Sequence, residues 1–367
     1  MKIVVLGGYG NFGARICRAL ARDGIEVVAT GRDPERGHRE AGFDGRVGKA
    51  RLDMHAPSFA SDLKALAPGM VIHCAGPFQG QSYQVAEASL AAGAHYIDLA
   101  DGRAFVVHFA HGVGGKAEAA RRVAVTGAST LPALSSAVVD ELRGRFKVLD
   151  EIQTSIAPAQ QAPRGTATLQ AVFSYVGRPF SWLEDGSSRT AFGWQELKRF
   201  RFAEFGTRWA AACDVPDLEL FPIRYPGVKT VQFRAALEFG IEHFVLTAIG
   251  GLRRLGIPVP IERWAGPLDR LVTRFDRLGG QRGGMLVRLV GQGKDGKPLR
   301  VEWHLTADSN HGPEIPCMAA ILVARKLIHG ELSGGCATPC MGLLSLEDFA
   351  QEFARWDIHT QVQEFRT

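Results

Sequence analysis

Residues 1–13 read MKIVVLGGYGNFG, a short apolar run followed by closely spaced glycines. The apolar run from Ile3 to Leu6 is typical of a strand that is buried on both faces. Residues 14–23, which follow the glycines, carry apolar side chains at helical spacing. The glycines therefore lie at a strand-to-helix corner, which is how a parallel α/β sheet begins.

Three of these glycines have the spacing GxGxxG, which at such a corner is typical of a dinucleotide-binding site. Gly8 is expected to permit the tight turn, Gly10 to let the backbone approach a pyrophosphate, and Gly13 to let the helix pack close to the strand. The N-terminus of the helix then offers N–H groups to the phosphates. A glycine-rich turn without a ligand is the alternative. The residues expected at the cofactor in this corner are Gly8, Tyr9, Gly10, Asn11, Phe12 and Gly13.

The end of the second expected strand, residues 26–30, decides between NAD and NADP. In NAD-binding sites an acidic residue usually ends this strand and holds the ribose 2′-hydroxyl. This chain has Thr30, Gly31 and Arg32 there, and Asp33 comes one residue later. A guanidinium at this position can form paired hydrogen bonds with a 2′-phosphate. The sequence therefore favours NADP(H) over NAD, with Thr30 and Arg32 at the cofactor. Contact of Asp33 with the ribose is the alternative.

Strands and helices continue to alternate as far as residue 130. Strands are expected over 50–53, 70–78, 95–99 and 123–126, with helices over 58–66, 83–92 and 105–122. Ligands of such sheets lie outside the carboxyl ends of the strands. Asp53 is expected near the adenine, with a surface cap as the alternative. A stiff apolar wall is expected beside the ribose and nicotinamide, with a purely structural turn as the alternative; it consists of Cys74, Ala75, Gly76 and Pro77.

Hydride transfer needs a proton donor near the acceptor. Tyr96, Asp98 and Asp101 follow the fifth strand into the same crevice and are the candidate catalytic residues. Strand alternation places Tyr96 and Asp98 on one face. A core position for Tyr96 and a turn cap for Asp98 are the structural alternatives. Further candidates, for which solvated histidines and a helix cap are the alternative, are His304, His311 and Glu314.

The pattern changes after residue 130. Partly alternating segments at 148–157, 228–237, 285–291 and 299–306 indicate strands with one buried face, and the last two flank a turn at 293–296 and should form a hairpin. Helices are expected over 166–177, 261–278 and 315–330. The predicted fold is α/β: a doubly wound parallel Rossmann sheet over 1–130, an α+β substrate or dimerisation domain with a mixed or antiparallel sheet over 131–312, and a C-terminal helix and loops over 313–367 that return to the Rossmann domain.

Composition excludes several classes of protein. The chain has 367 residues and a net charge of +5, and its arginines are scattered, which argues against a nucleic-acid surface. Of the six cysteines, Cys336 and Cys340 are the only close pair, so no metal site is expected. No signal peptide precedes the first strand, which favours the cytoplasm.

Two apolar segments of the predicted second domain are candidates for contact with a membrane or with a second copy of the chain. The segment 243–252 has about half the length needed to span a bilayer. An amphipathic stripe follows it at Ile261, Trp264, Leu268, Leu271 and Phe275. Such stripes are more typical of a core or a homodimer contact, and peripheral contact with a membrane is the alternative.

Several segments together resemble the saccharopine dehydrogenase-like oxidoreductases. They are GGYGNFG at 7–13, AGPFQ at 75–79, GAHYIDLAD at 93–101, GASTLPALSS at 127–136, GPEIP at 312–316 and LSGGCATP at 332–339. The resemblance implies a Rossmann domain followed by an α+β domain. It also implies hydride transfer between NADP(H) and a small or lipid-attached substrate with a C=N, C=O or C=C group, without implying saccharopine. A non-catalytic NADP(H) sensor or partner subunit is the alternative, because no Tyr-x-x-x-Lys pair follows the strands.

Overall fold

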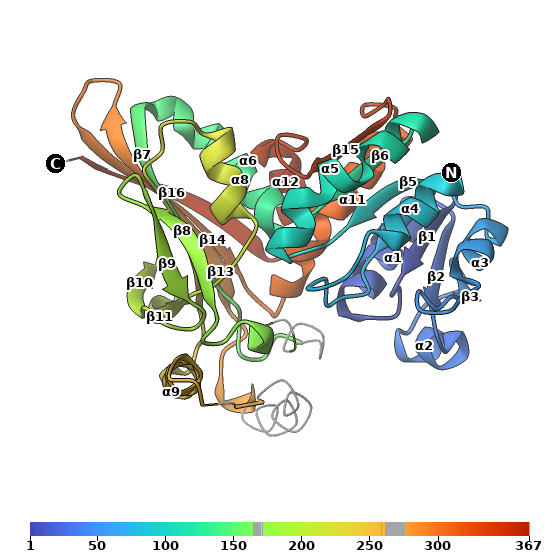
Figure 1. The fold of residues 1–367 in the computed structure, drawn as a ribbon, viewed down its shortest axis with the longest axis horizontal. Coiled ribbons are helices and arrows are strands. Elements are labelled where there is room, and N and C mark those ends of the chain that lie inside the picture. The colour runs from blue at the N-terminus through green and yellow to red at the C-terminus, as the bar shows by residue number, and fades with distance from the viewer. Residues whose placement is uncertain (164–169, 171, 258, 261–275, 367) are drawn as a thin grey trace. The chain divides into compact units, whose positions relative to one another are not determined.

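The structure is a computed structural model that describes residues 1–163, 170, 172–257, 259–260 and 276–366 (Figure 1). Its contacts divide the chain into two compact units. The first comprises Met1–Leu134 and Pro313–Leu344, and the second comprises Ser135–Gly312 and Ser345–Thr367. Each unit is built on a sheet of its own. The helix expected over 261–278 lies largely outside the described residues, and the helix expected over 166–177 lies partly outside them.

The first unit is a Rossmann fold on a parallel sheet of seven described strands. The strand order is β15-β6-β5-β4-β1-β2-β3, so the order reverses between β1 and β4. Ligands of such sheets bind beside this reversal. The strands are β1 (Ile3–Leu6), β2 (Val27–Gly31), β3 (Val47–Arg51), β4 (Met70–His73), β5 (His95–Asp98), β6 (Val123–Thr126) and β15 (Cys336–Pro339).

The central strands β1, β4 and β6 are buried along their whole length, as their continuous apolar sequence predicts. The helices of this unit are α1 (Asn11–Arg22), α2 (Pro34–Glu40), α3 (Phe59–Ala65), α4 (Gln84–Ala91), α5 (Arg103–Ala120) and α11 (Ile315–Ile328).

Helix α11 lies against α1, although most of the chain separates them in sequence. Arg15 Nε of α1 lies 2.8 Å from Glu314 Oε1, at the start of α11, and both side chains are largely buried. At the other end of α11, Arg325 lies 2.8 Å from Asp23. These pairs fix the register of α11 beside the glycine corner.

The second unit contains a mixed sheet of nine described strands. Their order is β10-β11-β12-β7-β13-β14-β16, and β8 pairs with both β12 and β9. Only β12 and β7 run parallel among these pairs. The strands are β7 (Phe146–Ala157), β8 (Pro179–Glu184), β9 (Ser187–Phe192), β10 (Lys198–Phe202), β11 (Gly206–Ala212), β12 (Thr230–Ala236), β13 (Gly283–Gly293), β14 (Pro298–Ala307) and β16 (Ile358–Arg366).

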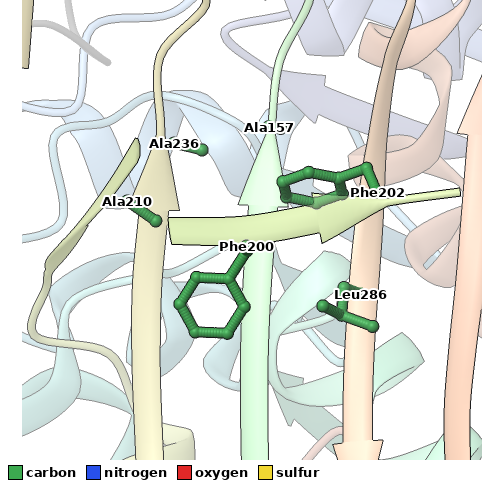
Figure 2. Packing of buried hydrophobic residues seen from close by; sticks show 6 residues of the cluster. All are labelled: Ala157, Phe200, Phe202, Ala210, Ala236 and Leu286. Carbon is green, nitrogen blue, oxygen red and sulfur yellow. The ribbon is translucent and has the colours of Figure 1, made fainter. Parts of the chain in front are cut away.

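Helices accompany this sheet, and part of its core is formed by β10. The described helices are α6 (Ser135–Leu142), α8 (Asp217–Arg224), α9 (Gly240–Arg254) and α12 (Leu346–Phe353). Phe200 and Phe202 of β10 pack with Leu286 in a cluster that also contains Ala157, Ala210 and Ala236 (Figure 2). The alanines leave room for the two rings, so the fold at β10 depends on their small volume.

Residues 345–366 correct one prediction. They were expected to return to the Rossmann domain as a helix and loops, but β16 pairs antiparallel with β14 from Ile358 to Arg366. The alternation of Ile358, Thr360 and Val362 is a strand signal, which the many polar residues of this segment obscure. The hairpin predicted for 285–306 is confirmed, because β13 pairs with β14 across the turn.

Candidate functional site

The glycine corner contains four glycines, and at three of them, Gly7, Gly8 and Gly13, the backbone leaves no room for a side chain. The backbone of Gly7 has φ +76°, and a Cβ at Gly8 would lie 2.8 Å from Ala29 Cα of β2. A Cβ at Gly13 would lie 2.3 Å from the carbonyl oxygen of Gly7. The tight turn expected at Gly8 is therefore made by Gly7, which adopts the left-handed conformation that favours glycine. Gly8 instead allows β2 to approach, and Gly13 allows α1 to pack on the corner.

Gly10 differs from the other three glycines because the space beside it is much less crowded. A Cβ there would meet only the carbonyl oxygen of Gly7, at 3.3 Å. Gly10 is also the N-cap of α1, with no side-chain cap and no acidic residue in the first turn. The first N–H groups of a helix lack partners within it, and the dipole makes this end positive. The corner is therefore suited to an anion.

Asn11 and Arg15 stabilise this helix end without closing it. The Arg15 guanidinium donates to Asn11 Oδ1 at 2.6 Å and to the Asn11 carbonyl oxygen at 2.7 Å. Because Arg15 also pairs with Glu314, its charge is largely neutralised. Phe12, the next residue, has its carbonyl oxygen 3.6 Å from Cys317 Sγ of α11. These contacts fix the first turn of α1.

Tyr9 connects the corner to β2 and α2. Its hydroxyl donates to the Ala29 carbonyl oxygen at 2.8 Å, and burial raises the pKa of Tyr9 to about 12, so the phenol remains neutral. A Cβ at Gly31 would lie 2.8 Å from the ring, and a Cβ at Gly37 would lie 2.5 Å from it. The Tyr9 ring therefore lies on Gly31 at the end of β2 and on Gly37 of α2.

Thr30 and Asp33, at the end of β2, both have structural hydrogen bonds within the first unit. Thr30 is fully buried and donates to the Val5 carbonyl oxygen at 3.0 Å, which makes it part of the sheet core. Asp33 caps α2 by accepting from the Arg36 N–H at 3.1 Å. Arg36 in turn pairs with Glu40 at 2.8 Å.

Two arginines at this edge remain exposed. Arg32 directly follows β2, and Arg51 of β3 is the register partner of Gly31. No ion pair of either guanidinium occurs in the described part of the chain. Lys49 of β3, by contrast, pairs with Glu35. The ends of β2 and β3 thus carry two positive charges that this unit does not neutralise. Sequence reasoning missed Arg51, although its place at the end of a strand was a usable signal.

The loop after β4 lies where the strand order reverses. A Cβ at Gly7 would lie 3.0 Å from the Ala75 nitrogen, so β1 and the loop are in close contact. Gln81 Nε2 donates to the carbonyl oxygens of Ala75 at 2.9 Å and Pro77 at 2.7 Å. Cys74, Ala75, Gly76 and Pro77 are each half-buried. This segment is a fixed wall at the place where Rossmann folds bind ligands.

A buried polar cluster lies beneath this wall. Tyr96 and Asp98 are both fully buried, and the Tyr96 hydroxyl lies 3.1 Å from His73 Nδ1 of β4. Asp98 Oδ1 accepts hydrogen bonds from three donors at the ends of β5 and β6. They are the Ala100 N–H at 2.9 Å, the Gly127 N–H at 2.8 Å and the Thr126 hydroxyl at 2.9 Å. Asp98 therefore holds the two strand ends together.

Burial sets the charges in this cluster. It lowers the pKa of His73 to about 3 and raises that of Tyr96, so both are neutral near pH 7. Burial also raises the pKa of Asp98 to about 6, although the N–H groups of Gly127 and Ala100 favour its charged form. Asp98 is therefore the group of the three that changes charge near neutral pH.

We expect an Asp98→Asn variant to change the pH dependence of stability. A carboxyl group whose pKa is higher in the folded than in the unfolded chain stabilises the fold below its ordinary value, and this contribution is lost as the pH rises through about 6. The amide oxygen can accept the same three hydrogen bonds. The free energy of unfolding of the variant, relative to the unaltered protein, should therefore rise by about 2–3 kcal/mol between pH 4 and pH 8. Urea unfolding across this range measures the difference, and parallel curves would contradict the assignment.

The remaining candidates are dispersed. Asp101 is exposed and accepts from Gln79 Nε2 at 3.2 Å. Asp53 accepts from the His55 N–H at 3.1 Å, as a turn cap does. Of the further candidates, His304 is buried 3.4 Å from Glu302, and His311 Nδ1 accepts from the Asp357 N–H at 3.2 Å. Asp101 is thus the exposed member of the three catalytic candidates.

Comparison with known families agrees with this geometry. Residues 3–139 match the family described as the saccharopine dehydrogenase NADP binding domain. Residues 3–139 are therefore similar to a saccharopine dehydrogenase NADP-binding domain. The glycine corner and the wall at 74–77 both lie within the matched residues. A search of curated proteins gave no match.

Solved structures extend the likeness beyond this NADP-binding domain. Apo saccharopine dehydrogenase (L-Glu forming) from Saccharomyces cerevisiae matches with a TM-score of 0.70 and 12% identity, over 99% of each chain. Homospermidine synthase from Legionella pneumophila, solved with NAD, has a TM-score of 0.60 and 9% identity, over 100% of this chain and 91% of the other. An amine dehydrogenase from Mycobacterium smegmatis has a TM-score of 0.52 and 13% identity, over 92% and 94%.

At these identities the likeness concerns the fold. The chain has the fold of a saccharopine dehydrogenase-like, NAD(P)-binding oxidoreductase, with an α/β first domain and a mixed sheet in the second. The predicted resemblance to this family is confirmed.

Proposed function

We propose that this protein is an NADP(H)-dependent oxidoreductase that transfers hydride between the nicotinamide and a small or lipid-attached organic substrate. The observation that carries the proposal is the uncapped N-terminus of α1 beside Gly10, where the backbone is open to a pyrophosphate. The family of the NADP-binding domain supports the same cofactor. When bound, NADPH supplies the hydride, and the protein supplies orientation and electrostatics.

The preference for NADP(H) is supported by the two exposed arginines. Arg32 and Arg51 flank Gly31 at the end of β2, where the adenosine ribose of a bound dinucleotide lies. Asp33, which could instead hold a ribose hydroxyl, accepts from the backbone of α2. Two guanidiniums without a counter-charge suit a 2′-phosphate better than a neutral hydroxyl.

We assign the proton transfer to Asp101. Tyr96 and Asp98 are fully enclosed and cannot reach a substrate, so their proposed role is to position the ends of β4, β5 and β6. Asp101 is exposed just after β5, and its partner Gln79 belongs to the loop that carries the wall. A carboxyl group there can exchange a proton with a reduced nitrogen, oxygen or carbon centre.

The acceptor is proposed to contain a C=N, C=O or C=C group. One structure with this fold is named an amine dehydrogenase, so a C=N acceptor is the first to test. The alternative is a protein that binds NADP(H) without turnover, as a sensor or partner subunit. It is favoured by the burial of two of the three candidate donors.

NADPH oxidation in the presence of cyclic imines, ketones and enoyl thioesters tests this function. With the accepted class, Asp101→Asn should lower kcat by about 100-fold or more, while NADPH affinity is unchanged, because proton transfer typically contributes 10²–10⁴-fold. Asp62→Asn, at an exposed position of α3, is the matched control and should retain full activity. Equal activity of both variants would remove Asp101 from the chemistry. NADPH binding without turnover of any class would favour the sensor.

A further inference from the structure

Helix α9 of the second unit presents apolar side chains to solvent. Ile241 is 73% exposed, Phe244 53% and Leu255, just after the helix, 79%. Val245 and Leu252 are also exposed, and Trp209 of β11 lies beside Phe244 with their ring centroids 6.2 Å apart. We call these residues the α9 patch: Trp209, Ile241, Phe244, Val245, Leu252 and Leu255. An exposed apolar patch of this kind usually marks a contact surface.

The orientation of α9 is fixed by its opposite face. His243 is fully buried and its Nε2 accepts from the Leu237 N–H at 2.8 Å. The Thr247 hydroxyl donates to the Trp194 carbonyl oxygen at 3.0 Å. Gly250 packs so closely on Gly177 that a Cβ at Gly177 would lie 2.5 Å from the Gly250 carbonyl oxygen. Since polar groups and glycine hold the inner face, rotation of the helix cannot bury the α9 patch.

Positive charges border the α9 patch. On β10, Phe200 and Phe202 point into the core, so Arg199 and Arg201 project to the opposite side, with Trp209. The Arg199 guanidinium lies 5.7 Å from the centre of the Trp209 ring. Arg254 is exposed at the other end of α9. Glu242 is the one acidic residue in the sequence of α9, and its carboxylate accepts a hydrogen bond from Gln160 Nε2.

We propose that the α9 patch binds the surface of an anionic membrane. Apolar side chains with an indole would enter the boundary between headgroups and acyl chains, while Arg199, Arg201 and Arg254 would meet the lipid phosphates. A twofold contact between two copies would bring the positive borders of both copies together. Repulsion between these like charges disfavours a second copy as the occupant of the α9 patch. No described helix is long and apolar enough to span a bilayer. The inference goes beyond the proposed hydride transfer and does not depend on it.

Flotation of the full-length protein with unilamellar vesicles tests this inference. The vesicles contain phosphatidylcholine alone or with about one third phosphatidylglycerol, so that only the second type carries negative charge. The protein should float with the anionic vesicles and much less with the neutral ones. Ile241→Asp combined with Val245→Asp should weaken vesicle binding by about tenfold or more, because two charges would enter the apolar boundary. Arg199→Glu with Arg201→Glu should abolish the preference for anionic vesicles.

A matched variant and a second measurement make the result decisive. Ile223→Asp alters an apolar residue of α8 that is 75% exposed and lies outside the α9 patch, so this variant should bind vesicles as the unaltered protein does. Unchanged circular dichroism and NADPH affinity would show that each variant is folded. Failure of the unaltered protein to float with anionic vesicles would overturn the inference. It would also be overturned if Ile223→Asp lost as much vesicle binding as Ile241→Asp with Val245→Asp. Sedimentation velocity without lipid tests the other possible occupant, a second copy of the chain. If the unaltered protein is a dimer that does not bind vesicles, and Ile241→Asp with Val245→Asp dissociates this dimer, the α9 patch belongs to a contact between two copies.

Discussion

A Gly10→Val variant should fold normally and bind NADPH at least about a hundredfold more weakly, which corresponds to ~2.7 kcal/mol. Gly10 has φ −75° and ψ 175°, an extended conformation that valine adopts readily. A Cβ there would meet only the Gly7 carbonyl oxygen, at 3.3 Å, a tight contact that a shift of a few tenths of an ångström relieves. The branched side chain would instead occupy the approach of the pyrophosphate to the N-terminus of α1. Thermal denaturation and fluorescence titration with NADPH measure the two effects separately.

Gly13 provides the contrast. A Cβ there would lie 2.3 Å from the Gly7 carbonyl oxygen, which is backbone and cannot move aside. Gly13→Ala should therefore destabilise the first unit by about 1–3 kcal/mol or more before any effect on the cofactor is considered. A folded Gly10→Val protein with unchanged NADPH affinity would show that the corner is only a structural turn.

Arg32→Ala should weaken NADPH binding by about tenfold to a hundredfold and leave NADH binding almost unchanged. A charge-assisted hydrogen bond to a phosphate is worth about 1.5–3 kcal/mol, and NADH lacks the 2′-phosphate. Arg51→Ala should act in the same direction, because Arg51 is the register partner of Gly31 on the neighbouring strand. Calorimetric titration of both nucleotides into each variant gives the two affinities.

Arg36→Ala is the matched control for these two variants. Arg36 is also exposed and lies in α2, but Glu40 neutralises it at 2.8 Å, so its removal should leave both affinities unchanged. Equal losses for NADPH and NADH in Arg32→Ala would indicate a general disturbance of the loop. If NADPH affinity fell in Arg32→Ala but not in Arg51→Ala, Arg32 alone would contact the 2′-phosphate.

The features predicted correctly from the sequence were those specified by neighbouring residues. The run from Ile3 to Leu6 indicated a buried strand because apolar residues on both faces leave no solvent side. The turn at 293–296 indicated a hairpin because the flanking segments are adjacent in the chain. Strand β16 was missed because its partner β14 lies some fifty residues earlier, and nothing in a polar edge strand identifies a distant partner.

In the candidate site too, the sequence predicted what neighbouring residues specify and missed what depends on residues far apart in the chain. The spacing of the glycines located the corner, but it did not show that Gly7, outside the GxGxxG pattern, makes the left-handed turn. Alternation placed Tyr96 and Asp98 on one face of β5, yet their burial depends on α5 and on His73 of the adjacent strand. Arg51 became a candidate only when β3 was seen beside β2. Residues that meet through strand pairing or packing are not encoded in local spacing.

Calorimetric titration of NADPH and NADH into the unaltered full-length protein tests most directly whether the glycine corner and its two arginines form an NADP(H) site. We expect one NADPH per chain, bound at least about tenfold more tightly than NADH because the 2′-phosphate meets Arg32 and Arg51. Absence of binding for both nucleotides, or tighter binding of NADH, would contradict the proposed function.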